Sequence, residues 1–115
     1  MTEEQTAIVK RLCTLLQDET VQREVPMFGG IAFMVNEKMI VSVGKHGGLL
    51  VRVDGARHDE LIGRAGAAQA EMGAGRTMGP GWIAVDASGI EDEESLAFWV
   101  RTALEYNRSV TGGRV

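Results

Sequence analysis

The chain has 115 residues, of which 44% are hydrophobic and 24% are charged, and its formal net charge is −4. This size predicts one domain over residues 1–115 that buries about 65% of the surface exposed by the unfolded chain, and the composition excludes a disordered or membrane-spanning protein. The negative charge argues against broad attraction to phosphate backbones, and the sole cysteine excludes an internal disulfide or a cysteine-rich zinc site.

The N-terminal segment predicts an amphipathic helix that begins after Thr2. Thr2 and Gln5 fit a capping box, and the two glutamates between them place negative charge where a helix start favours it. At helical spacing, the apolar residues of this segment fall in one arc. They are Ile8, Val9, Leu12, Cys13, Leu15 and Leu16. We expect this arc to lie on the core.

The next part of the chain predicts extended segments joined by short turns. Pro26 has no backbone donor, so residues 21–25 should form an extended or short edge strand. Alternating apolar residues indicate strands at 31–35, 39–43 and 49–53. The connections, residues 36–38 and 44–48, suit hairpins and leave no room for parallel crossovers, so the three strands should form an antiparallel meander.

The second half predicts shorter elements and a final helix. Residues 56–64 indicate a short helix, residues 67–71 a weak strand among loop-forming glycines, and residues 82–85 a closing strand. Asp92 can cap a last amphipathic helix, and residues 111–115 should fray. The expected fold class is α+β: an antiparallel meander packed by an N-terminal and a C-terminal amphipathic helix, with a short middle helix.

Several motifs occur in a fixed order along the chain. They are Met27-Phe28-Gly29-Gly30, the hairpin through Asn36 and Lys38, Gly75-Arg76-x-Met78-x-x-Gly81-Trp82-x-x-Val85, and Leu96-x-x-Trp99-Val100-x-x-Ala103-Leu104. Together they resemble the TfoX N-terminal domain of bacterial regulators of natural competence. The resemblance implies an antiparallel sheet flanked by helices and supplies no catalytic residues. Those regulators carry a second, C-terminal helical domain, and we expect this chain to be a stand-alone version without it.

Candidate catalytic and metal-binding residues are few. Cys13 would need a base such as His46 or His58 to act as a nucleophile, and its place in the apolar arc predicts a buried, inert residue instead. His46, Asp54 and His58 lack the dense spacing of metal ligands, and we expect them to lie in solvated loops. The glycine-rich residues 73–76 lack the ending of a P-loop. We therefore predict no catalytic residue, metal or cofactor, and no enzyme.

Two groups of residues are candidates for binding surfaces. Phe98 lies about 100° around the last helix from Trp99, outside its core stripe, and a patch that joins it to Met27 and Phe28 would mark a surface for a partner or for self-association. The alternatives for Phe98 are packing against the core or a single exposed ring. Arginines could instead converge on an anion or a nucleic acid, because the guanidinium suits phosphate. They are Arg52, Arg57, Arg64 and Arg76.

The leading interpretation is a non-catalytic regulatory or protein-interaction domain. Its partner would be an unknown protein or a second copy of the chain, as in a homodimer. A nucleic-acid-binding module that uses the arginines is the alternative, and a small enzyme that uses Cys13 is the third. The first residues resemble no signal peptide, and no apolar run approaches the roughly 18 residues of a membrane span, so we expect no membrane partner and a cytoplasmic location.

Overall fold

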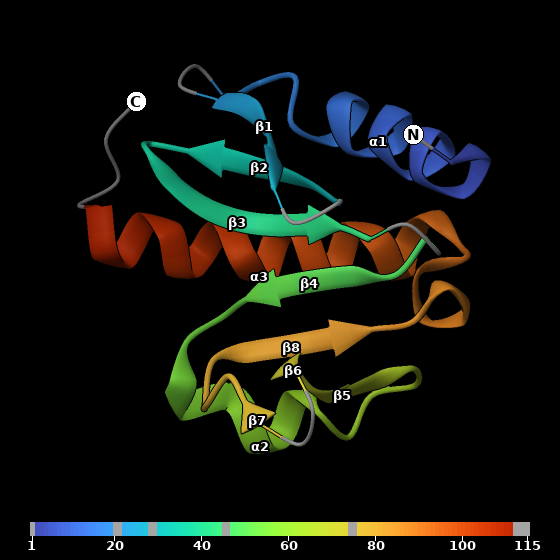
Figure 1. Ribbon diagram of the computed structural model, residues 1–115. Helices are drawn as coiled ribbons and strands as arrows, with labels where there is room; N and C mark the ends of the chain where they lie inside the picture. The colour runs from blue at the N-terminus through green and yellow to red at the C-terminus, as the bar shows by residue number, and fades with distance from the viewer. Residues whose placement is uncertain (1, 20–21, 28–29, 45–46, 74–75, 112–115) are drawn as a thin grey trace.

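The computed structural model describes residues 2–19, 22–27, 30–44, 47–73 and 76–111. A six-stranded sheet with the order β1-β2-β3-β4-β8-β5 forms its centre, and all neighbouring strands are antiparallel. The strands are β1 (Gln22–Met27), β2 (Gly30–Val35), β3 (Lys38–Val43), β4 (Leu49–Arg52), β8 (Trp82–Val85) and β5 (Ala67–Gln69). A separate two-stranded sheet contains β6 (Glu71–Gly73) and β7 (Arg76–Thr77). The expected α+β fold and antiparallel meander are confirmed (Figure 1).

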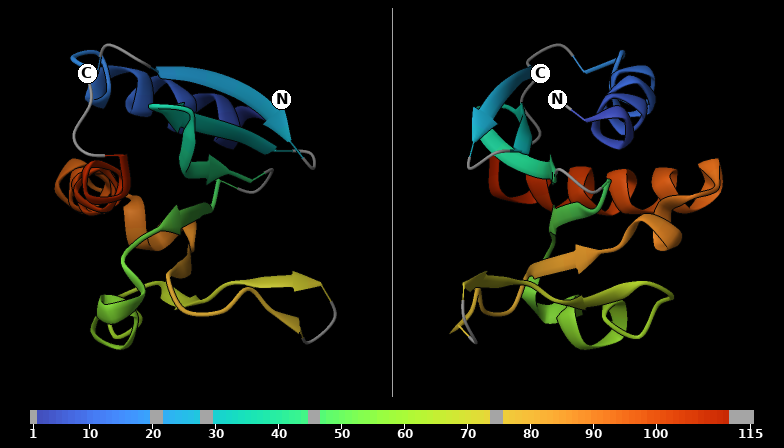
Figure 2. Two further views of the ribbon diagram at one scale, coloured as in Figure 1. Left: turned by 90° about the vertical axis from the view of Figure 1, so that its left-hand side faces the viewer. Right: turned by 45° about the vertical axis from the view of Figure 1, so that its right-hand side comes forward.

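The helices gather on one side of the six-stranded sheet. They are α1 (Glu3–Leu15), α2 (His58–Leu61) and α3 (Glu93–Thr111), with the 3₁₀ helices η1 (Gly55–Arg57) and η2 (Ala87–Ile90). The long helix α3 packs against β3 and β4 and contacts α1. In the left panel of Figure 2, α3 is seen end-on to the left of the sheet, whereas β6 and β7 extend to the right. No helix in the described ranges combines the length and apolar character needed to cross a bilayer.

The start of α1 follows the sequence prediction, but its buried stripe is narrower. The backbone amide of Gln5 donates to Thr2 Oγ1 at 3.1 Å, and the Thr2 amide donates to Gln5 Oε1 at 3.2 Å, which completes the capping box. Cys13 was expected in the core, and this prediction is wrong because the thiol is exposed. The buried stripe is centred on Leu12, and Cys13 lies about 100° around the helix from it, beside Glu24 of β1.

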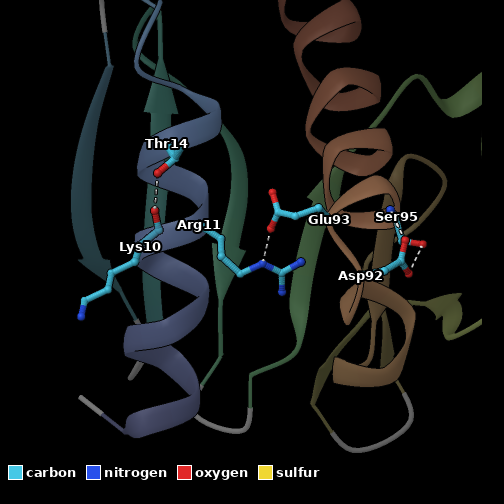
Figure 3. Close-up of polar contacts among 6 residues, drawn as sticks. All are labelled: Lys10, Arg11, Thr14, Asp92, Glu93 and Ser95. Carbon is cyan, nitrogen blue, oxygen red and sulfur yellow. Dashed lines mark hydrogen bonds and ion pairs between the residues drawn. The ribbon is translucent and has the colours of Figure 1, made fainter.

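The start of α3 is also capped as predicted. Asp92 Oδ2 accepts a hydrogen bond from the Ser95 amide at 3.0 Å, and Asp92 Oδ1 accepts one from the Ser95 hydroxyl at 2.8 Å (Figure 3). In the next residue, Glu93 Oε1 accepts a hydrogen bond from Arg11 Nε at 2.7 Å, so an ion pair joins the middle of α1 to the first turn of α3. Because the Glu93 side chain is 69% exposed, this pair contributes at most about 1 kcal/mol to the contact between the two helices.

The turn between β2 and β3 has an unusual backbone and is held by α3. Its two central residues, Asn36 and Glu37, have φ values of +53° and +66°, which is the conformation of a type I′ hairpin turn. Asn107 of α3 is 2% exposed, and its Nδ2 donates to the Val35 carbonyl at 2.8 Å. Its Oδ1 accepts a hydrogen bond from Asn36 Nδ2 at 3.2 Å. A buried amide therefore fixes the turn to the helix layer.

The core lies between the helices and one face of the sheet, and none of the described helices covers the other face. Along β4, Leu49 and Val51 are buried, whereas Leu50 and Arg52 between and after them are half-exposed. On β8, Ile83 and Val85 are buried and the residues that alternate with them are half-exposed. Because successive strand residues point to opposite faces, Leu50 and Ala84 lie on the free face. Arg52 is the last residue of β4 and reaches Tyr106 of α3.

The remaining differences from the predictions are local. The weak strand expected at 67–71 is interrupted at Ala70, whose amide donates to the Trp82 carbonyl at 3.1 Å and whose carbonyl accepts from the Met78 amide at 2.9 Å. The chain therefore leaves β5 and begins β6 in the second sheet. The short middle helix is confirmed as η1 followed by α2. Of the segment expected to fray, residues 112–115 lie outside the described residues.

Candidate functional site

A groove of about 840 Å³ lies on the free face of the sheet. Its floor contains Ala68 of β5, Ala84 of β8 and Leu50 of β4, which stand side by side because Ala84 is the register partner of both other residues. Larger apolar residues also line it: Met39, Met78 and Trp82. The two alanines leave space that the larger side chains enclose, so the groove follows from residue size at outward-facing strand positions.

Glycines at the sides of the groove allow close backbone approach. A Cβ on Gly30 would lie 2.6 Å from the Val43 carbonyl oxygen, which is shorter than the van der Waals contact of these atoms. Gly66 has φ +80°, and its Cβ would lie 2.7 Å from Asp86 Oδ1. Any side chain at these two positions would force the walls apart.

The described residues that line the groove give it a negative charge. Among the described residues that line it, the ionisable ones are Glu71 and Asp86, and none is basic. Asp86 accepts hydrogen bonds from the Ser88 hydroxyl at 2.6 Å and from the Gly89 amide at 3.1 Å, and these bonds lower the pKa of its carboxyl group. Asp86 is thus ionised at neutral pH, and the groove suits a neutral or positively charged occupant.

A smaller cleft of about 290 Å³ adjoins the groove, and Met39 and Trp82 line both. It lies between α3 and the ends of β3 and β4. The guanidinium carbon of Arg52 lies 4.7 Å from the ring centroid of Trp82 and 5.0 Å from that of Tyr106, and Arg52 Nη2 donates to Tyr106 Oη at 3.2 Å. Two aromatic rings therefore hold this guanidinium in place. Lys38 lies in the same cleft.

Comparison with known proteins identifies the family of this chain. The model of the TfoX N-terminal domain matches residues 15–106. The chain belongs to the TfoX N-terminal domain family. Comparisons with curated proteins and with solved structures gave no match. The matched residues include every described residue that lines the groove and all but Asn107 and Val110 of those that line the cleft.

In this TfoX N-terminal domain, the four arginines singled out from the sequence have separate surroundings. Arg57 Nε donates to Glu60 Oε1 at 3.0 Å, Arg64 lies 3.7 Å above the centroid of the Phe98 ring, and Arg76 is exposed on β7. No contact in the described structure joins one of these arginines to another. Arg52 alone among them lies in either of the two hollows described above. The nucleic-acid alternative stays a prediction.

The predicted interaction patch is only partly visible. Phe98 lies outside the core stripe of α3 as predicted, and of the alternatives left open for it the structure shows core packing, because the side chain is half-buried against the core. The Phe98 and Trp99 rings meet edge to face, with centroids 5.3 Å apart and planes at 82°, and the Arg64 guanidinium lies over the Phe98 ring. Phe28 and the side chain of Met27 lie outside the described residues, so a patch formed by all three stays a prediction.

The exposed thiol of Cys13 lacks the surroundings of a catalytic nucleophile. Its Sγ donates a hydrogen bond to Glu24 Oε2 at 3.6 Å. Partial burial and the neighbouring Glu24 carboxylate raise the pKa of the thiol. Since the thiolate is the reactive form, both effects oppose reactivity. A nucleophile is activated by the reverse arrangement, a neighbouring cation or base.

The candidate metal ligands also have structural contacts. His58 was expected to be solvated, and this is wrong because the side chain is 6% exposed at the start of α2 and its Nδ1 accepts a hydrogen bond from the Gly81 amide at 3.0 Å. Asp54 caps η1 by accepting from the amide two residues later, at 2.9 Å. His46 and residues 74–75 lie outside the described part, and within it no three His, Cys, Asp or Glu residues are placed to hold a metal.

The groove is the feature that the sequence analysis missed. The sequence does contain a signal for it. Inward and outward residues alternate along β8 and β5, and the small residues Ala84 and Ala68 occupy outward positions. Two small outward residues in separate strands indicate a hollow only when their register is known, and that pairing joins segments about 16 residues apart in the sequence. The positions of Met39 and Met78 above this floor depend on further tertiary packing.

Proposed function

We propose that this TfoX N-terminal domain is a non-catalytic, cytoplasmic protein-interaction domain with a regulatory role, and that its groove binds an extended segment of a partner protein. The single observation that carries the proposal is the groove itself. It has about 840 Å³ of space and an apolar floor on a sheet face without a helix. Open apolar surfaces of this kind are typical of binding sites.

The lining also defines the chemistry of the partner. Ala68, Ala84 and Leu50 offer an apolar floor onto which aliphatic or aromatic side chains can pack. Glu71 and Asp86 place two carboxylates at the groove without a basic residue among the described lining. A segment that combines apolar side chains with lysine or arginine complements both features, whereas an acidic segment would be repelled.

The experiment is a selection of random 12-residue peptides, displayed on phage, against the immobilised domain. A groove-filling variant, Ala84→Phe, serves as the comparison because Ala84 is half-exposed at the floor and phenylalanine is well tolerated in strands. The matched control is Arg101→Phe, which adds the same ring at an exposed position of α3 outside the groove lining. Circular dichroism and thermal unfolding establish that all three proteins are folded.

We expect peptides with apolar and basic residues to be enriched on the wild type and on Arg101→Phe, and to lose binding to Ala84→Phe. Failure to enrich any sequence, enrichment of acidic sequences, or equal binding to Ala84→Phe would refute the proposal. A second copy of the chain is the competing occupant. It would be identified by light scattering, if the mass of the wild type doubles with concentration while Ala84→Phe stays monomeric, and that result would replace the partner segment.

A further inference from the structure

The small cleft carries positive charge that the rest of the described structure does not neutralise. Lys38 and Arg52 line it, and no acidic residue does so among the described residues. Neither cation has a carboxylate within ion-pair distance in the described ranges. In a chain with a net charge of −4, this is a local reversal of sign.

Arg52 is also fixed in position before any ligand arrives. Its guanidinium contacts the rings of both Trp82 and Tyr106 and donates one hydrogen bond to the tyrosine oxygen. Gly81, with φ +92°, leaves the space for it, since a Cβ there would collide with the Arg52 side chain. The remaining N–H groups are donors of the kind that bind carboxylate or phosphate, and a guanidinium that is already ordered loses little entropy on binding.

The apolar part of the cleft limits the ligand further. Tyr106 and Val110 of α3 line it, and Val110 is 46% exposed. The volume of about 290 Å³ is at the lower end of small-molecule sites and admits a ring or a short chain, not a large cofactor.

We propose that this cleft binds a small organic anion. The ligand places a carboxylate or phosphate group at Arg52 and Lys38 and an aromatic ring or short aliphatic body against Tyr106 and Val110. This goes beyond the protein-interaction function proposed for the groove, because the cleft has the opposite charge and selects a different class of molecule.

The test uses four probes: phenyl phosphate, benzoate, inorganic phosphate and benzylamine. Phenyl phosphate and benzoate compare the two acidic groups, inorganic phosphate removes the ring, and benzylamine reverses the charge. Binding to the whole chain is followed by ¹H–¹⁵N chemical shifts at low ionic strength. The variants are Lys38→Gln, at an exposed position, and Arg52→Gln, with Arg57→Gln as the control because that arginine is paired with Glu60 outside the cleft.

We expect phenyl phosphate or benzoate, or both, to bind more tightly than inorganic phosphate, and benzylamine to leave the cleft unchanged. Lys38→Gln should weaken binding of the preferred probe about 3-fold to 5-fold, as for an exposed charge, and Arg52→Gln about 10-fold or more. Arg57→Gln should have no effect, and the groove-filling Ala84→Phe should still bind the preferred probe because Ala84 does not line the cleft, so failure of this proposal is separable from failure of the other.

Equal chemical-shift changes with benzylamine and with the anions would overturn the inference. Unchanged anion affinity in Lys38→Gln would also overturn it, because this variant at an exposed position should fold normally. A single-stranded 12-nucleotide DNA that binds with a steep salt dependence, while phenyl phosphate and benzoate do not bind, would assign the cations to nucleic acid instead. Thermal unfolding of Arg52→Gln distinguishes loss of binding from loss of the fold.

Discussion

Replacing Asn107 by leucine tests how strongly α3 holds the β2–β3 turn. The side chain is 2% exposed and donates to the Val35 carbonyl at 2.8 Å. Leucine has a similar size but no donor, so the carbonyl loses a partner in a buried place, which costs about 1–3 kcal/mol. Asn36 also loses its acceptor, but it is half-exposed and can bond to water. Extra apolar burial by leucine offsets part of the loss, leaving a net destabilisation of about 1–2 kcal/mol.

Urea unfolding followed by circular dichroism measures this effect. With a slope of about 2 kcal/mol per molar urea, the middle of the range usual for small proteins, the midpoint of Asn107→Leu should fall by about 0.5–1 M. The control is Glu105→Leu, at an exposed position of the same helix, which should change stability by less than about 0.5 kcal/mol. A midpoint for Asn107→Leu within about 0.2 M of wild type would show that the turn does not depend on the buried amide.

Three further substitutions test local features. Glu37→Gly should stabilise the domain by about 0.5–1 kcal/mol in urea unfolding, because φ is +66° there, and a destabilised variant would contradict the strain. Gly30→Ala should cost about 1–3 kcal/mol through the 2.6 Å clash with a backbone carbonyl, whereas Gly44→Ala, with 3.8 Å to its nearest neighbour, should be near neutral, so equal losses would refute the argument. At pH 8, iodoacetamide should alkylate Cys13 faster in Glu24→Gln than in wild type, since Glu24 raises the pKa of the thiol and reduces the thiolate; unchanged rates would exclude that coupling.

The elements of this fold are predictable where local signals agree with packing. The capping box at Thr2, the cap at Asp92 and the alternating strands all specify their structures through neighbouring residues. Cys13 and Phe98 show where such reasoning ends, because each lies at the margin of a helical stripe. Whether a marginal residue is buried depends on the element facing it: Glu24 leaves the thiol exposed, and Arg64 covers the phenylalanine ring.

Polar core residues are harder to predict for a similar reason. His58 can be buried because its Nδ1 accepts a hydrogen bond from the Gly81 amide. Asn107 can be buried because its side-chain amide donates to the carbonyl of Val35, 72 residues away in the sequence. A lone histidine or asparagine in a sequence has no local mark that identifies a distant backbone partner. The groove is hard to predict for the same reason. Its small floor residues can be read from the sequence, but the strand register that places them side by side depends on tertiary structure.

The wall between the groove and the cleft connects the two proposals. Trp82 lines both hollows, and on the cleft side its ring stacks on Arg52. An anion that moves the Arg52 guanidinium would change the packing of the Trp82 ring. A partner segment bound in the groove would contact the same ring. If each ligand shifts Trp82, their affinities must change by the same factor in both directions, because coupling between binding equilibria is reciprocal. If Trp82 stays fixed, the buried Ile83 beside it on β8 anchors the wall rigidly and the two hollows act independently.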